Sequence, residues 1–290
     1  MTALYDIAAP AKLNLFLHIT GKRADGYHLL QSVFALIDWC DTLHFELRND
    51  GEISREDLST PLPAEDLIVR AARALKTVCS TPKGVHIGVD KKIPAQAGMG
   101  GGSSDAASCL LALNRLWQLN LTLEQLSRIG LTLGADVPFF LGGRNAWVEG
   151  IGEKITPVSL PSARYLVVKP PDGLQTALIF AHPALKTDTI AATISGFAAD
   201  FRCFGRNDLQ DVAQRLCPGV TQAVEWLKSQ GLNGRMTGSG SAVFALGSEN
   251  LGDIDLGTVP SNFDVRWCKS LDVHPLFGWA SSDSLPVSGV

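Results

Sequence analysis

A run of glycines between residues 94 and 104 constrains this chain more than any other feature. The stretch reads Pro-Ala-Gln-Ala-Gly-Met-Gly-Gly-Gly-Ser-Ser, and it lies between an apolar alternation at Ile87 and Val89 and an apolar segment that ends near Trp117. Alternation with a period of two predicts a strand, and the apolar segment is typical of a buried helix. The chain is therefore predicted to contain a strand, a glycine loop and a helix in direct succession.

A loop of this kind is suited to phosphate. Glycine tolerates backbone conformations in which successive N–H groups point at one anion. The helix that follows adds the positive end of its dipole, worth about half an elementary charge. A flexible turn is the alternative, but turns rarely need this many glycines followed by paired serines and a long apolar helix. We therefore predict a phosphate-binding loop.

Three other phosphate-binding designs are excluded by the sequence. No Lys-Ser or Lys-Thr pair follows the glycines, as the P-loop requires, and a G-x-G-x-x-G pattern from Gly98 places Ser103 where the last glycine belongs. The D-F-G and H-R-D motifs of protein kinases are absent as well. The loop belongs to a different class of phosphate site.

The segment from Lys12 to Ile19 is a predicted strand with two polar side chains on one face. Its odd positions are Leu, Leu, Leu and Ile, while Lys12 and Asn14 fall together on the other side. Alternation or apolar runs predict further strands at residues 42–47, 165–169 and 242–246. Strands and helices are interleaved along the chain, so we expect a mixed α and β protein.

Helical spacing of apolar residues is visible at residues 67–78. A broad apolar surface predicts a buried helix at residues 104–117, and residues 220–228 are also predicted to be helical. A further helix should begin at Thr122, which forms a capping box with Gln125, and stop at Gly130. Pro138 should end any helix soon after Asp136, which gives this aspartate a defined position.

The length of 290 residues and a hydrophobic content of 46% allow one large core or two moderate ones. The segment from Ser159 to Ser162 is the best candidate for a linker. We therefore expect a catalytic domain at residues 1–158 and a second domain at residues 159–290, whose last ten residues should be frayed.

Charge and composition argue against several partners. The formal net charge of -4 gives no general attraction to nucleic acid or anionic membranes. The first residues lack a basic segment followed by an apolar one, and no apolar run approaches the roughly 20 residues needed to cross a bilayer. We expect a cytoplasmic monomer or weak homodimer that binds neither nucleic acid nor membrane. The six cysteines are dispersed without a C-x-x-C pair, so we expect reduced core residues.

Several motifs in the right order resemble the superfamily of galactokinase, homoserine kinase, mevalonate kinase and phosphomevalonate kinase. They are the glycine loop, Pro10-Ala11-Lys12-Leu13-Asn14-Leu15 and Thr237-Gly238-Ser239-Gly240-Ser241-Ala242. Within the superfamily, Arg23-Ala24-Asp25-Gly26-Tyr27-His28 and Leu133-Gly134-Ala135-Asp136-Val137-Pro138 are similar to the 4-diphosphocytidyl-2-C-methyl-D-erythritol kinases. The resemblance runs from about Pro10 to Phe244.

The resemblance implies an α+β fold of two domains, with the active site in the cleft between them. The N-terminal domain would be like ribosomal protein S5 domain 2, and the C-terminal one ferredoxin-like. The implied reaction transfers the γ-phosphoryl group of ATP, with Mg²⁺, to the 2-hydroxyl of 4-diphosphocytidyl-2-C-methyl-D-erythritol in the non-mevalonate route to isoprenoid precursors. The expected partner is this small molecule, a methylerythritol linked to cytidine diphosphate.

Catalytic and nucleotide-binding roles follow residue by residue from the resemblance. Asp136 matches the aspartate that accepts the hydroxyl proton, and Lys12 matches the lysine that stabilises charge on the transferring group. Without the resemblance, Asp136 would be read as a turn residue and Lys12 as a solvated strand residue. Ser104 is expected near Mg²⁺ or a β-phosphate oxygen, with N-capping by Ser103 as a competing role for the serines. The implied phosphate loop comprises Pro94, Ala95, Gln96, Ala97, Gly98, Met99, Gly100, Gly101, Gly102, Ser103 and Ser104.

The implied substrate pocket draws on two segments. Tyr27 and His28 match positions that stack on and hydrogen-bond the cytosine, while Thr176 and Phe180 match a second wall. Taken alone, the Tyr-His pair would be a loop feature. Asn14 either holds the substrate or is a polar surface position.

The chain also departs from the superfamily pattern. Glu65-Asp66-Leu67 stands where Asp-Asn-Leu is common, so an amide contact near the adenine is in doubt. Gly252, Gly257 and Pro260 fall where a crossover helix is expected, which favours a short or missing helix. Two alternatives stay open, another small-molecule kinase such as a homoserine or mevalonate kinase and a non-catalytic nucleotide-binding module. The Tyr27-His28 segment argues against the first, and the presence of both Lys12 and Asp136 argues against the second.

Overall fold

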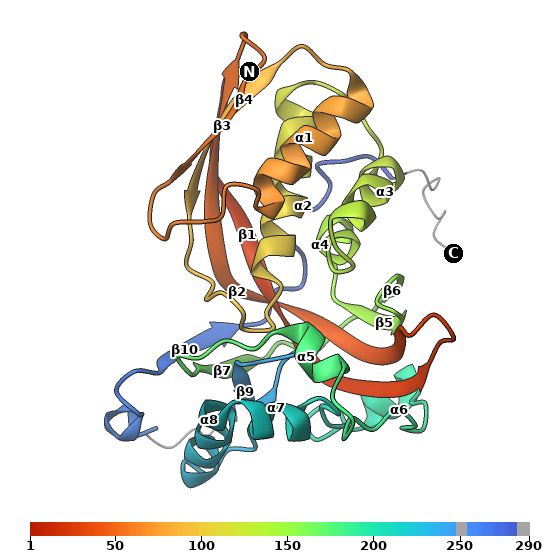
Figure 1. Cartoon of the computed structure of the whole chain (residues 1–290), viewed down its shortest axis with the longest axis vertical. Coiled ribbons are helices and arrows are strands. Elements are labelled where there is room, and N and C mark those ends of the chain that lie inside the picture. The colour runs from red at the N-terminus through yellow and green to blue at the C-terminus, as the bar shows by residue number, and fades with distance from the viewer. Residues whose placement is uncertain (248–253, 283–290) are drawn as a thin grey trace.

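The computed structural model of the chain describes residues 1–247 and 254–282, which form two α+β bodies, one above the other in Figure 1. The first body is built on a six-stranded sheet in the order β3-β4-β2-β5-β6, with β1 paired to β2. β3 and β4 are parallel, and the other pairs are antiparallel. The strands are β1 (Ala3–Lys22), β2 (His28–Arg48), β3 (Ile53–Asp57), β4 (Gly84–Asp90), β5 (Ala146–Gly150) and β6 (Lys154–Pro157).

Helices cover one face of this sheet (Figure 1). They are α1 (Leu67–Cys79), α2 (Gly101–Leu116), α3 (Leu123–Leu133) and α4 (Val137–Gly142). The helix α2 is buried on most of its circumference, which explains why its sequence is apolar without a strong periodicity. Its Leu110 and Leu113 belong to the same core as Leu43 and Phe45 of β2. This packing fixes the end of α2 that follows the glycine loop.

The second body contains a four-stranded antiparallel sheet in the order β10-β7-β9-β8. The strands are β7 (Arg164–Lys169), β8 (Arg235–Met236), β9 (Val243–Leu246) and β10 (Asp264–Lys269). The helices are α5 (Thr176–Phe180), α6 (Ile194–Ala199), α7 (Gln210–Leu216), α8 (Pro218–Ser229) and the 3-10 turn η1 (Leu256–Thr258). The α+β class and the two-part organisation are as predicted.

Two segments join the bodies. The far part of the β1–β2 hairpin extends along the second body, where Leu17 and Ile19 pack with Leu166 of β7. After β10 the chain returns to the first body as a strap, residues 270–281. The backbone N–H of Leu271 donates to the Leu36 carbonyl at 2.8 Å, and the N–H of His274 donates to the Gly143 carbonyl at 2.8 Å. The boundary expected at residue 159 falls between β6 and β7, and we keep it as a proposal.

The structure corrects three local predictions. α2 begins at Gly101 rather than Ser104, because Gly100 lies in the left-handed conformation with φ 72° and precedes the first turn. α3 has the predicted capping box but runs through Gly130 to Leu133. Pro138 lies in the first turn of α4 instead of ending a helix. Proline is tolerated there because a backbone N–H in the first turn has no carbonyl acceptor within the helix, so no hydrogen bond is lost.

The remaining expectations concern the C-terminal part and the cysteines. Near the expected crossover helix, the described residues 254–263 contain η1 and no longer helix, while residues 248–253 and 283–290 lie outside the described ranges. All six cysteines are free, and Cys109, Cys217 and Cys268 are buried. Cys203 is exposed in the turn after α6, so it is not a core residue. Within residues 1–247 and 254–282, no helix combines the length and apolarity needed to cross a membrane.

Candidate active site

The glycine loop, the strand that carries Lys12 and the C-terminal glycine motif at residues 237–242 meet in one place. The backbone N–H of Lys12, on β1, donates to the Met99 carbonyl at 3.0 Å. From the other side, the N–H of Ser241 donates to the Gln96 carbonyl at 3.1 Å, and the N–H of Ala242 donates to the Ala97 carbonyl at 3.1 Å. The glycine loop is therefore held between the N-terminal strand and the C-terminal glycine motif.

Two glycines of the loop are required by both conformation and space. Gly98 and Gly100 each have φ near 72°, in the left-handed region that favours glycine. A Cβ at Gly98 would lie 2.2 Å from the Thr237 carbonyl oxygen, and one at Gly100 would lie 2.9 Å from the Phe140 ring. The loop is thus closely packed against its neighbours, in contrast to a flexible turn.

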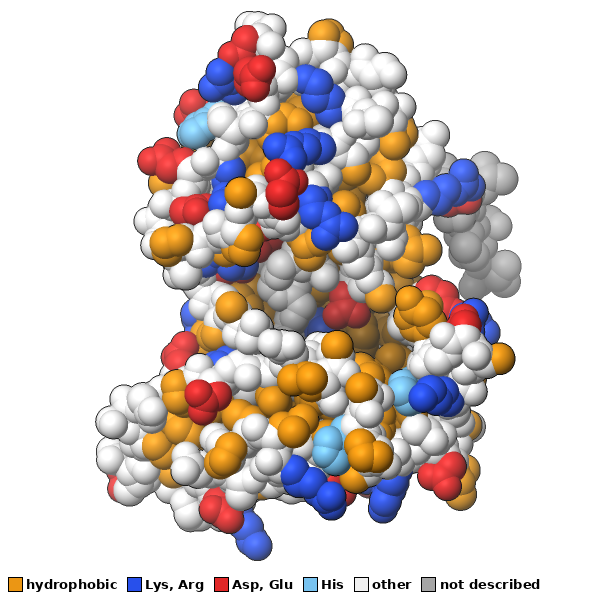
Figure 2. Space-filling model, in the orientation of Figure 1, with side chains coloured by type: hydrophobic (Ala, Val, Ile, Leu, Met, Phe, Trp, Pro, Cys, Tyr) orange, Lys and Arg blue, Asp and Glu red, His pale blue; other side chains and the backbone are white. Residues whose placement is uncertain are grey.

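A cleft of ≈ 770 Å³ opens along this loop, between the two bodies. Figure 2 shows the hollow between the upper and lower parts of the molecule. Its volume is that of a small-molecule site. Of the residues predicted to bind ligand or act in catalysis, the lining contains Lys12, Asn14, Asp136, Thr176, Phe180 and residues 94–103. Tyr27, His28 and Ser104 lie outside this lining.

Lys12 and Asp136 form an ion pair in the cleft. The Lys12 Nζ lies 3.6 Å from Asp136 Oδ2, and the lysine side chain is 5% exposed while that of the aspartate is 30% exposed. Burial lowers the pKa of Lys12, while the Asp136 charge acts in the opposite direction. Asp136 is the N-cap residue of α4 but makes no side-chain capping bond. A buried cation beside a carboxylate that solvent reaches is an arrangement suited to proton transfer.

Asn14 orients the lysine. Its Oδ1 accepts a short hydrogen bond from the Lys12 ammonium, and its Nδ2 donates to Ser32 Oγ at 2.8 Å. The N–H of Asn14 donates to Thr237 Oγ1 at 2.9 Å, which ties the strand to the C-terminal glycine motif. The ring of Phe34 lies below Lys12, with 4.4 Å between Nζ and the ring centroid. These contacts make Asn14 a structural partner of Lys12, and its substrate contact stays a prediction.

The two serines at the start of α2 differ in position. Ser103 lines the cleft, whereas Ser104 is fully buried and its Oγ has no hydrogen-bond partner among the described residues. N-capping by Ser103 is wrong, because the N-cap residue is Gly100 and both serines lie within the helix. The expected contact of Ser104 with a metal ion stays a prediction.

The expected base pocket brings the tip of the β1–β2 hairpin to α5. The ring of His28 lies 5.3 Å from that of Phe180 between centroids, with 32° between the ring planes. Burial, followed by the charge of Lys22, lowers the pKa of His28 and favours the neutral imidazole. Thr176 Oγ1 and Ser239 Oγ are 2.7 Å apart, and Tyr27 is 61% exposed. Thr176 and Phe180 thus line the cleft and His28 packs against Phe180, while a role for the exposed Tyr27 stays a prediction.

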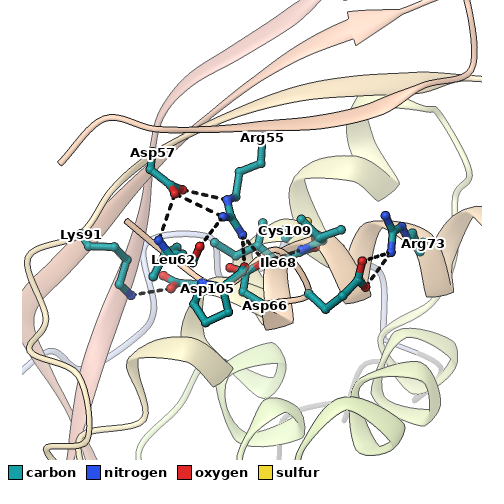
Figure 3. A network of polar contacts seen from close by, with 12 residues as sticks. Arg55, Asp57, Leu62, Asp66, Ile68, Arg73, Lys91, Asp105 and Cys109 are labelled. Carbon is teal, nitrogen blue, oxygen red and sulfur yellow. Dashed lines mark hydrogen bonds and ion pairs between the residues drawn. The ribbon is translucent and has the colours of Figure 1, made fainter. Parts of the chain in front are cut away.

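Sequence reasoning missed a polar network beside the other end of the cleft (Figure 3). Arg55 Nε donates to Asp57 Oδ1 at 2.8 Å, and Arg55 Nη1 lies 2.8 Å from Asp66 Oδ1. Asp66 also accepts the N–H of Val69 at 3.0 Å and so caps α1. This explains the departure at Glu65-Asp66-Leu67, because a carboxylate at residue 66 serves both the helix and Arg55. An acidic residue directly before an apolar helix was the available signal.

A second missed group lies behind the loop. Lys91 contacts Asp41 and lies 2.5 Å from Asp105 Oδ2, with both carboxylates buried. Burial raises the pKa of Asp105 to about 8, against the opposing effect of the Lys91 charge. Burial also acts to lower the pKa of Lys91, but the two carboxylates outweigh it and raise that pKa. No local pattern in the sequence indicates this group, because Asp41, Lys91 and Asp105 come from three separate segments.

Comparison with known proteins gives consistent matches. The family model for the GHMP kinases N terminal domain matches residues 66–144, and that for the GHMP kinases C terminal matches residues 188–263. A protein of Albidiferax ferrireducens named 4-diphosphocytidyl-2-C-methyl-D-erythritol kinase is 74% identical over 99% of both chains. A protein of Variovorax paradoxus with the same name is 64% identical over 97% of this chain and 100% of its own.

The comparison with solved structures gives the same result as the comparison with sequences. A crystal structure of 4-(cytidine 5'-diphospho)-2C-methyl-D-erythritol kinase superposes with a TM-score of 0.77 at 32% identity, over 91% of this chain and 98% of that one. A homoserine kinase from Cytophaga hutchinsonii superposes with a TM-score of 0.69 at 16% identity, over 94% and 96% of the two chains, which shows the shared fold.

Proposed function

Because the chain belongs to the GHMP kinases and, within them, to the 4-diphosphocytidyl-2-C-methyl-D-erythritol kinases, we propose that it phosphorylates this substrate from ATP. The 2-hydroxyl oxygen of the methylerythritol moiety forms a bond to the γ-phosphorus while the bond to the β,γ-bridging oxygen breaks. The products are ADP and the 2-phosphate. The hydroxyl proton passes to an acceptor in the cleft.

One observation supports this chemistry most directly, the Lys12–Asp136 pair beside the glycine loop. Phosphoryl transfer needs an oriented hydroxyl, a proton acceptor and charge stabilisation more than it needs covalent participation by the protein. Asp136 is the acceptor, since its carboxylate is partly exposed in the cleft and makes no capping bond to α4. The Lys12 ammonium, held by Asn14, stabilises the charge that develops on the transferred group.

The glycine loop binds the triphosphate of ATP. Residues 94–103 line the cleft, and α2 directs its N-terminus at the same space. The left-handed Gly98 and Gly100 set the direction of the loop and bring it between Thr237 and Phe140.

Mg²⁺ is proposed as the metal of the reaction, and it neutralises phosphate charge when bound. The chain offers an oxygen donor that suits this hard cation, the Ser104 hydroxyl, which is buried and has no hydrogen-bond partner among the described residues. Within the described ranges no three His, Cys, Asp or Glu side chains gather as a metal cage. The protein would therefore supply one or two ligands and leave the rest to phosphate oxygens and water.

The cytidyl group is placed against the hairpin tip. Tyr27 supplies an exposed aromatic face, His28 supplies ring nitrogens that can hydrogen-bond a base edge, and Phe180 with Thr176 forms the opposite wall.

We further propose that the protein is a monomer or a weak homodimer. Light scattering at two protein concentrations tests this proposal.

The function is tested by ADP release with the cytidyl substrate, homoserine and mevalonate side by side. We expect turnover only with the cytidyl substrate, and mass spectrometry should then find one added phosphate on it. Turnover of homoserine or mevalonate instead would contradict the assignment.

A further inference from the structure

Asp41 of β2 holds the segment that leads into the glycine loop. Its carboxylate is fully buried, and Oδ1 accepts the backbone N–H groups of Lys92 at 2.5 Å and Ile93 at 2.8 Å. Oδ2 accepts from the ammonium of Lys91. One side chain therefore binds three consecutive residues between the end of β4 and Pro94.

This segment forms part of the cleft wall. Lys91 and Ile93 line the cleft together with the loop. A Cβ added at Gly101 would lie 3.0 Å from Ile93 Cγ2 and 3.6 Å from Asp41 Oδ2. Asp41 thus lies beneath the point where the loop enters α2, and a shift of residues 91–93 would move both ends of the loop.

Lys91 is bound too tightly to serve as a phosphate ligand. Its side chain is 12% exposed, and it bridges Asp41 on the sheet to Asp105 on α2. Figure 3 shows its contact with Asp105. A lysine near a phosphate loop would ordinarily be assigned to the anion, but here both carboxylates compete for the same ammonium. Its position fits an internal connection between β4 and α2.

Buried backbone N–H groups need an acceptor, and a carboxylate is the strongest one that a protein offers. Ile93 is 4% exposed, so water cannot easily replace Asp41 at its N–H. The loss of this acceptor would release residues 92 and 93 from the sheet and leave the phosphate loop without a fixed entry.

We propose that Asp41 is a positioning residue for nucleotide binding, which acts by holding residues 91–93 beneath the glycine loop. The inference rests on the proposed function, because it takes the loop to be the ATP site. It predicts that disruption of Asp41 weakens the binding of nucleotide selectively and leaves the cytidyl pocket, at the other end of the cleft, unaffected.

The test is Asp41→Asn, which keeps the shape of the side chain but replaces one acceptor oxygen with a donor. The Kd of a non-hydrolysable ATP analogue is measured by calorimetry, and the kinetic constants for both substrates by ADP release. We expect the Kd and the KM for ATP to rise about tenfold or more, since hydrogen bonds to charged groups are lost. The kcat at saturating ATP should fall less than about threefold, and the KM for the cytidyl substrate should not change.

Asp38→Asn is the matched control. Asp38 lies three residues earlier on β2, and its Oδ1 likewise accepts a backbone N–H, that of Lys269 at 2.8 Å. This contact ties β2 to β10, away from the loop. The control should therefore bind the ATP analogue as the wild type does. A Kd raised equally in both variants would indicate a general loss of packing and overturn the proposal.

Lys91→Met decides the question if Asp41→Asn does not fold. This variant removes the ammonium, leaves Asp41 facing Asp105, and should also raise the Kd of the analogue. The double variant Lys91→Met, Asp105→Asn should recover part of the lost affinity, because it removes one of the two facing acids. An unchanged Kd in folded Asp41→Asn, or in folded Lys91→Met, overturns the positioning role alone. A wild-type protein that fails to bind the analogue overturns the proposed function together with this inference.

Discussion

The Lys12–Asp136 pair and the Asp41–Lys91–Asp105 cluster contain the same types of side chain and differ in how completely each charge is bound. Asp136 is 30% exposed and stands 3.6 Å from its lysine, without a capping bond. Asp41 is fully buried and accepts two backbone N–H groups and an ammonium. A group that must take up a proton needs free lone pairs, whereas a group that fixes a backbone needs none. Asp136, the proposed reacting charge, makes no capping bond in the cleft, whereas Asp41, the proposed positioning charge, has partners on both carboxylate oxygens. Within the same cluster, Asp105 Oδ1 is buried without a partner among the described residues.

The largest effect is expected from Asp136→Asn, which removes the reacting charge. The amide cannot accept the hydroxyl proton, so kcat should fall by about 10² to 10⁴. The glycine loop is unchanged, so the Kd of an ATP analogue should stay within about twofold of the wild type. Steady-state kinetics and calorimetry on the same preparation check both. Turnover near the wild-type rate would remove Asp136 from its role.

Lys12→Met should have the next largest effect. It removes the cation beside the transferring group, and kcat should fall by about 10² to 10³. The exposed Lys228→Met on α8 is the control and should leave kcat unchanged. If Lys12→Met raised only the KM for ATP, Lys12 would belong with the positioning charges, and the comparison would fail.

Phe180→Ala tests the cytidyl end of the cleft. Loss of the ring that faces His28 removes one wall of the base pocket, and the KM for the cytidyl substrate should rise about tenfold, since stacking on a base is worth about 1 to 3 kcal/mol. The KM for ATP should be unaffected. Leu178→Ala, on the same helix but 55% exposed, is the matched control. Equal KM values for the cytidyl substrate in both variants would place the base elsewhere.

The smallest effect is expected from Asp66→Ala, which removes a positioning charge at the edge of the cleft. The variant loses the cap of α1 and a partner of Arg55, so the free energy of unfolding should fall by about 1 to 2 kcal/mol. Urea denaturation measures this loss. Glu65→Ala, whose exposed ion pair with Arg73 lies next to it, should be nearly neutral. A stability of Asp66→Ala equal to that of Glu65→Ala would contradict the role of the cap.

Much of the architecture was accessible from local sequence because it depends on local rules. The strand, glycine loop and helix follow from periodicity and from the conformational freedom of glycine, and the capping box at Thr122 needs only Gln125 three residues later. The start of α2 was misplaced by three residues, since only the backbone angle of Gly100 shows where the first turn begins.

The positioning charges were out of reach of the sequence. Asp41, Lys91 and Asp105 are separated by many residues and meet only after β2, β4 and α2 have packed. The strap at residues 270–281 is a similar case, because its return to the first body depends on tertiary contacts such as that of His274 with Gly143. Lys12 and Asn14 were predictable as neighbours, but their approach to Asp136 rests on the resemblance to known kinases.

The central distinction between reacting and positioning charge is tested most directly by the rate of a single turnover at saturating ATP, measured by rapid quench in Asp136→Asn and Asp41→Asn. We expect Asp41→Asn to transfer phosphate to the cytidyl substrate at close to the wild-type rate once its weakened site is filled. Asp136→Asn should remain slow at every ATP concentration. Equal rates in the two variants at saturation would contradict the account.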